Sequence, residues 1–191
     1  MDGLDDLLAG ATAGIAPGYF QLSIDGGPSV YRERVYCYEL YHQMRLGWPK
    51  DGPFVLNGEV DKAGHGLLRE LGVGAFKPDF LVHVPGSMDG NHAVIEVKPE
   101  GEVFAKADKD LNTLSIFLTR ARYARGIYLV YGHNIHDDHI QHILAVDAKM
   151  EVRAPIELWL HRAPGEPARL ERVLGETKRS VLRHRLTRAK T

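Results

Sequence analysis

Two short apolar segments separated by a turn restrict the folds that this chain can adopt. The first runs from Pro78 to Val84, and the second runs from His92 to Lys98, where Pro99 ends it. Residues 85–90 read Pro-Gly-Ser-Met-Asp-Gly, a composition typical of the turn between adjacent antiparallel strands. Apolar runs of this length, bounded by turn signals, are typical of buried strands. The pair therefore predicts two neighbouring strands of one sheet.

The segments on either side of this pair predict an α/β domain. A helix capped by Ser29 is expected from about Val30 to Leu46, with an apolar stripe along one face. A strand-to-helix-to-strand connection later in the chain places a helix against a mixed sheet. The other expected elements are strands at 54–60, 127–131 and 156–161 and helices at 104–123 and 139–150. The core order is helix, three strands, helix, strand, followed by C-terminal additions.

Composition and charge favour one soluble domain with a basic tail. The chain has 191 residues and a single cysteine, so it fits one domain (1–168, core about 30–131) without an internal disulfide. No signal peptide or membrane span is recognised, which predicts a cytoplasmic protein that does not associate with a membrane. From 169 to 191, eight Lys or Arg outweigh two Glu, giving +6 against -7 for the remainder. A polyanionic partner and an ordinary solvated tail both explain this asymmetry.

Three charged residues interrupt the two apolar strands. Glu96 and Lys98 lie on the same face of their strand because side chains alternate. Asp79, at the start of the neighbouring strand, can lie near Glu96 at the end of the other. Two adjacent carboxylates repel each other unless a cation neutralises them, and oxygen ligands favour a hard ion such as Mg²⁺. A lysine beside that ion can stabilise charge on a phosphate, so the set suits phosphodiester hydrolysis.

The segments 76–84 and 92–98 resemble the signature of the PD-(D/E)xK nuclease superfamily. The resemblance covers about residues 30–131 and implies a restriction-endonuclease-like core. It implies metal binding by Asp79, Glu96 and the backbone carbonyl of Val97, and a catalytic role for Lys98. Members usually add an acidic residue from the preceding helix or strand. The candidates are Glu39, slightly favoured, and Glu59.

Basic residues outside this motif are candidates for nucleic-acid binding. Lys106 and Lys109, with Asp110 beside them, lie near the start of the second long helix, where phosphate-contacting or metal-adjacent groups would be useful. An ordinary polar helix face is the simpler explanation of these three residues. Arg179, Arg183 and Arg185 in the tail are suited to backbone phosphates. The chain has little room for a separate domain that recognises DNA sequence. Specificity for a DNA target would therefore come from a homodimer, a partner protein or substrate shape.

The leading hypothesis is a Mg²⁺-dependent deoxyribonuclease, an endonuclease of restriction or defence in which Mn²⁺ substitutes for Mg²⁺. The alternative is a catalytically inactive nucleic-acid-binding or scaffold protein with the same fold. RNA cleavage and hydrolysis of a small phosphate also stay open. His136, His139 and His142 repeat every three residues and admit a zinc site, although a loop and a polar helix face are the default explanation. Cys37 lies on an apolar stripe and is expected in the core.

Overall fold

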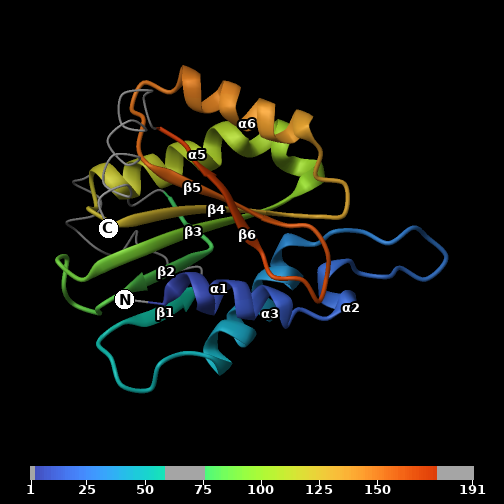
Figure 1. Ribbon diagram of the computed structural model, residues 1–191, viewed down its shortest axis with the longest axis horizontal. Helices are drawn as coiled ribbons and strands as arrows, with labels where there is room; N and C mark the ends of the chain where they lie inside the picture. The colour runs from blue at the N-terminus through green and yellow to red at the C-terminus, as the bar shows by residue number, and fades with distance from the viewer. Residues whose placement is uncertain (1–2, 59–75, 176–191) are drawn as a thin grey trace, which may run out of the picture.

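The computed structural model describes residues 3–58 and 76–175, in which one six-stranded mixed sheet lies between two layers of helices (Figure 1). The strands are β1 (Val55–Gly58), β2 (Phe80–His83), β3 (Asn91–Pro99), β4 (Arg125–Tyr131), β5 (Ile156–His161) and β6 (Arg169–Val173). They lie in that order across the sheet. The pairs β1–β2, β2–β3 and β5–β6 are antiparallel, whereas β3–β4 and β4–β5 are parallel. The predicted α/β class and mixed sheet are confirmed.

The helices cover both faces of this sheet. They are α1 (Leu4–Ala13), α2 (Pro17–Phe20), α3 (Glu33–Leu46), α5 (Val103–Thr119) and α6 (Asp137–Lys149), with a 3-10 turn η1 (Glu100–Glu102) before α5. In Figure 1, α1 and α3 lie on one side of the sheet and α5 and α6 on the other. Each layer buries its own apolar cluster, because alternate strand residues face opposite sides. The described part of the chain contains no helix long and apolar enough to cross a membrane.

The first long helix begins later than the sequence predicted. The N–H of Val30 donates to the carbonyl of Leu22 at 2.9 Å, and the Leu22 N–H returns the bond at 2.8 Å. This antiparallel bridge keeps Val30 extended, so the helix starts at Glu33 and Ser29 does not cap it. Helix α3 then buries Tyr36 and Cys37 on the face that meets the sheet.

Strand β3 is the central strand that carries the expected Glu-x-Lys motif. Its side chains are almost all buried, because β2 and β4 flank it and helices cover both faces. Ile95 and Val97 pack into the cluster under α3, whereas Val94 packs under α5. Because side chains alternate along a strand, those of Glu96 and Lys98 leave β3 toward the α5 layer. The motif lies near the carboxyl end of β3, where the two helical layers meet.

The sheet extends past the predicted domain boundary at residue 168. Arg169–Val173, expected as the start of a basic tail, forms β6 and pairs with β5. Four of its five residues are exposed, so the segment lacks the apolar pattern that identifies a buried strand. Just before it, the N–H of Ala168 donates to Thr12 Oγ1 at 2.8 Å and ties this segment to α1. The residues after 175 lie outside the described part of the chain.

Candidate active site

Asp79 lies immediately before β2, beside the end of β3. Its Oδ2 accepts a hydrogen bond from the backbone N–H of Val97 at 2.7 Å. Burial raises the pKa of Asp79 to about 7, because lost hydration outweighs the Val97 bond that favours the charged form. Repulsion from Glu33 adds to the rise, and Lys98 opposes it. The carboxyl is thus held beside β3 in a setting that disfavours its negative charge.

Glu96 is the second carboxylate that the sequence predicted, and the fold brings it to Asp79. Its residue is 7% exposed, and its carboxyl is close enough to Asp79 for a hydrogen bond. Burial first, and then repulsion from Asp79 and Asp110, raise the pKa of Glu96 well above its ordinary value. Two buried carboxyl groups in contact repel each other when both are charged, and a nearby cation would stabilise their charged forms.

Lys98 is held by acids from both helical layers. Its Nζ lies 2.6 Å from Glu33 Oε2 of α3 and 3.3 Å from Asp110 Oδ2 of α5. Burial lowers the pKa of Lys98, but the two carboxylates more than offset this effect and leave the pKa above its ordinary value. The ammonium is therefore a fixed positive charge. Its residue is 4% exposed, and it lies at the meeting point of α3, α5 and β3.

The helix acid at this site is Glu33, which the sequence analysis missed. Glu39, the residue it favoured, instead accepts a hydrogen bond from Gln43 at 2.7 Å one turn along α3. Glu33 precedes buried Cys37 by four residues and so lies on the inward stripe, whereas Glu39 is two residues past Cys37 and points elsewhere. The four-residue spacing between Glu33 and Cys37 could therefore have identified Glu33 from the sequence. Glu59 lies outside the described residues.

Asp110 is the second acid that the motif alone did not identify. The sequence groups it with Lys106 and Lys109 as polar residues near the start of the helix, but in the structure Asp110 is only 4% exposed. Burial raises its pKa, while Lys98 lowers it. Its position three residues after Ala107 and one before Leu111 puts it on the buried face of α5, which was the available signal. Four carboxyl groups thus surround one ammonium: Glu33, Asp79, Glu96 and Asp110.

The donor set fits a hard divalent cation. The backbone N–H and C=O of one strand residue point to the same edge, so the Val97 carbonyl faces the side on which its N–H meets Asp79. Asp79, Glu96 and this carbonyl offer three oxygen donors, and Mg²⁺ usually completes its shell with water. Within residues 3–58 and 76–175, no three His, Cys, Asp or Glu side chains form a ready-made metal site. The fit therefore rests on two carboxylates and a carbonyl.

No family model, curated protein or solved structure matches this chain. The comparisons thus add no relative whose activity bears on this site. The chemistry of the cluster around Lys98 is therefore what indicates a function.

Of the other residues predicted to bind nucleic acid, only Lys106 and Lys109 lie in the described part of the chain. Lys106 pairs with Glu102 one turn before it, and both side chains are largely exposed. Lys109 is exposed on α5 beside buried Asp110. Arg179, Arg183 and Arg185 lie outside the described residues. The structure thus leaves the expected DNA contacts as predictions.

The histidine cluster has a structural explanation in the part of the chain that is described. The backbone N–H of His136 donates to the His139 ring at 3.2 Å, which caps the start of α6. The rings of His139 and His142 each lie 4.9 Å from the Phe104 ring. Cys37 lies in the core as expected, and burial raises the pKa of its thiol.

Proposed function

We propose that this protein is a Mg²⁺-dependent deoxyribonuclease of the PD-(D/E)xK type, with a restriction-endonuclease-like core. The observation that carries the proposal is one connected cluster at the end of β3 in which Asp79 and Glu96 meet beside Lys98. Asp79 and Glu96 come from a strand start and a strand end that lie 17 positions apart in the sequence, and the register that pairs Phe80 with Ile95 brings them side by side. Pairs of buried carboxylates next to a fixed cationic group suit phosphodiester hydrolysis.

Asp79, Glu96 and the Val97 carbonyl would hold the ion. A bound Mg²⁺ supplies Lewis acidity toward phosphate oxygens and acidifies its water ligands. The residues themselves explain why an ion is needed, because both carboxyls have raised pKa values that a nearby divalent charge would lower again. The N–H of Val97 holds Asp79 Oδ2, which fixes this carboxyl at the edge of β3 where the ion would bind.

Lys98 acts in this proposal as a fixed cation rather than as a base. Glu33 and Asp110 keep its pKa above the ordinary value, so it stays protonated at neutral pH. Its ammonium can bind a non-bridging phosphate oxygen and stabilise the charge that develops during hydrolysis. Glu33 and Asp110 hold the ammonium in position from α3 and α5. Residues from both helical layers therefore orient the Lys98 side chain.

Cleavage of supercoiled and linear DNA, and of RNA, with and without Mg²⁺ or Mn²⁺ tests the proposal. We expect metal-dependent cutting of DNA that falls by at least about 100-fold in Asp79→Asn and in Lys98→Met. Closed-circle cutting would show endonuclease action. Matched controls are Asp108→Asn on exposed α5 surface and Lys149→Met at the exposed end of α6, which remove the same charges elsewhere.

Two results would contradict the proposal. Equal cutting by wild type and Asp79→Asn would place any nuclease activity outside this cluster. A folded wild type that binds DNA but cuts no substrate with either metal would favour the inactive nucleic-acid-binding alternative. Thermal unfolding of each variant shows whether a loss of activity reflects a loss of fold.

A further inference from the structure

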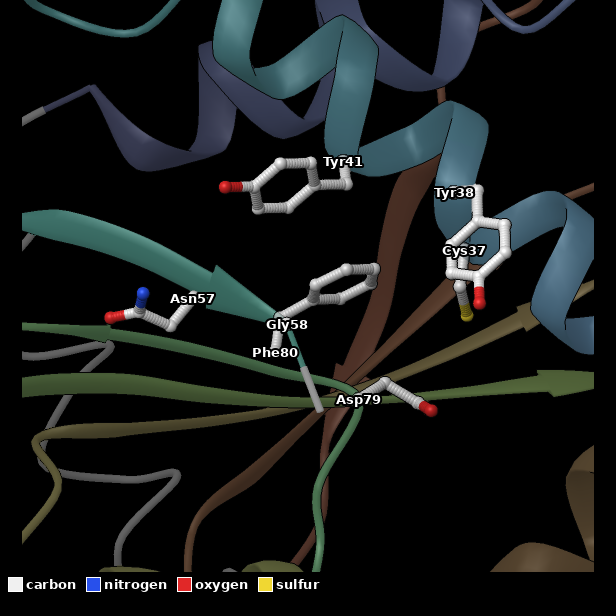
Figure 2. A pocket seen from close by; sticks show the side chains of 7 residues that line it. All are labelled: Cys37, Tyr38, Tyr41, Asn57, Gly58, Asp79 and Phe80. Atoms are coloured by element: carbon white, nitrogen blue, oxygen red, sulfur yellow. The ribbon is translucent and has the colours of Figure 1, made fainter. Parts of the chain in front are cut away.

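A cavity of about 310 Å³ adjoins the cluster on the α3 side of the sheet (Figure 2). It lies between α3 and the antiparallel pair β1–β2. Its lining residues are Cys37, Tyr38, Tyr41, Asn57, Gly58, Asp79 and Phe80. Asp79 therefore belongs both to the proposed metal site and to the wall of this cavity. A ligand in the cavity would therefore lie against Asp79, one of the residues of the proposed metal site.

The walls of the cavity are aromatic. The rings of Tyr41 and Phe80 lie 6.4 Å apart and are nearly parallel, with an interplanar angle of 18°. The Tyr41 hydroxyl donates to the carbonyl of Leu56 at 3.4 Å, which helps to hold that ring in place. Asn57 points away from the rings in Figure 2, and its Oδ1 is bonded to His83 Nε2 at 2.8 Å. Beyond Asp79, the cavity offers flat apolar faces and few polar partners.

Tyr38 places a further aromatic ring beside Asp79. It follows buried Cys37 on α3, and Figure 2 shows its ring near the Asp79 end of the cavity. The residue is 64% exposed, the second most exposed of the large hydrophobic residues in the described chain. Within residues 3–58 and 76–175, no hydrogen bond or ring contact holds this side chain in place. A ring that is free to stack, next to a site for phosphate chemistry, fits a planar ligand.

We infer that this cavity binds an unpaired nucleobase of the nucleotide next to the scissile phosphate. The inference rests on the proposed nuclease function, since Asp79 fixes where the phosphate lies. One sugar joins that phosphate to its base, so the base has to lie close to the Asp79 end of the cavity. A paired base is stacked in the duplex and cannot enter a pocket without leaving the stack. The preferred substrate is therefore single-stranded DNA or DNA with an unpaired nucleotide.

Fluorescence anisotropy with labelled oligonucleotides tests this inference. The full-length protein is titrated, with Ca²⁺ in place of Mg²⁺, against a single strand, a blunt duplex and a duplex with one unpaired nucleotide; a gel confirms that each probe stays intact. The wild type should bind the two probes with unpaired bases more tightly than the blunt duplex. Tyr38→Ala should weaken that binding by about 5- to 150-fold, the range for loss of one base–aromatic stack.

The controls separate the ring from its surroundings. Tyr38→Phe keeps the ring and should retain wild-type binding, and Tyr19→Ala removes another exposed tyrosine, on α2, without effect. Binding that is equal for all three probes, or unchanged in Tyr38→Ala, would overturn the base pocket while the nuclease proposal stands on its cleavage assay. A folded wild type that neither binds nor cuts any probe would overturn both.

Discussion

Lys98 is the residue on which the local electrostatics of the site depend. Four carboxyl groups lie around its ammonium, and the pKa values of Asp79, Glu96 and Asp110 are all raised. Such an excess of buried acid is costly in a fold without a further cation. This imbalance is consistent with the proposed metal site, in which a bound divalent cation would offset the excess negative charge. It also identifies which substitutions report on the site.

Glu33 and Glu39 form a matched pair on one helix. Glu33→Gln removes the charge that contacts Lys98 at 2.6 Å, and we expect DNA cleavage to fall by about 10- to 100-fold, as for residues that orient a reacting group. Glu39→Gln removes the same charge at a position whose bond within the described residues is to Gln43, and it should leave the rate unchanged. Steady-state cleavage rates measure both. A larger loss in Glu39→Gln would show that the wrong acid has been assigned.

The raised pKa of Asp79 predicts how the stability of the metal-free protein depends on pH. Its pKa of about 7 in the fold exceeds the ordinary value of 3.8, so the folded state binds its proton more tightly than the unfolded state does. The contribution of Asp79 to the free energy of unfolding is fully present at low pH and is lost as the pH rises from about 4 to about 7. Asp79→Asn keeps an acceptor for the Val97 N–H and removes the titration. The variant should become progressively more stable than the wild type over that range, by at most about 1.4 kcal/mol per pH unit.

Urea unfolding of both proteins in EDTA at several pH values measures this difference. Comparison between variants is needed because burial lowers the pKa of His161 to about 4, and that group changes stability in the opposite direction over an overlapping range. A difference between the two proteins that is constant from pH 4 to 8 would show that Asp79 is not perturbed. Asp108→Asn, on the exposed face of α5, is the control.

At the scale of elements, the site depends on how closely α5 packs on the sheet, because α5 carries Asp110. Gly126 in β4 marks that contact: a Cβ added there would lie 2.8 Å from Leu118 Cδ1 and 3.2 Å from its Cγ. Helix and strand must separate, or Leu118 must move, to admit a side chain. A glycine in a strand is often a point of close approach, and here the structure shows what approaches.

Gly126→Ala should destabilise the protein by about 1–3 kcal/mol, the usual cost of overpacking a core. For a chain of this length, that corresponds to a fall in Tm of roughly 2–12 °C. Differential scanning calorimetry provides the measurement. Gly101→Ala in η1 is the control, because a Cβ there meets nothing within 4 Å. Equal melting temperatures for the two variants would mean that α5 yields to the added methyl group at little cost.

Elements differed in how well the sequence predicted them. Strand β5 was predicted with its observed ends, because a run of apolar residues buried on both faces is a strong local pattern. Strand β6 was not predicted, since its exposed residues carry no such pattern and only pairing with β5 makes it a strand. The start of α3 was displaced by the bridge between Leu22 and Val30, a contact between separate parts of the chain.

At the scale of the whole molecule, DNA binding should depend on the basic end of the chain. Residues 176–191 contain six Lys or Arg and one Glu. Replacing Arg179, Arg183 and Arg185 together by Gln should weaken DNA binding and lower the magnitude of the slope of log K against log salt by about 2–3, because each phosphate contact contributes about 0.9. Anisotropy titrations at several salt concentrations measure the slope.

The control variant also replaces Arg by Gln, but in strand β6 rather than in the tail. Arg169→Gln with Arg172→Gln removes two exposed charges from β6 and should change the slope little. An unchanged slope in the triple variant would make the tail an ordinary solvated end, the other explanation of its charge. A large change in the β6 variant would instead move the DNA contact onto the sheet edge.

The sequence by itself determined the catalytic candidates on the strands, whereas the tertiary structure decided which acids complete them. Asp79, Glu96 and Lys98 could be found because strand alternation and an antiparallel turn are local rules, and these rules bring the three residues together in any sheet that pairs the two strands. Glu33 and Asp110 reach Lys98 from opposite layers. Their positions depend on how α3 and α5 pack on the sheet, which short-range sequence patterns do not encode.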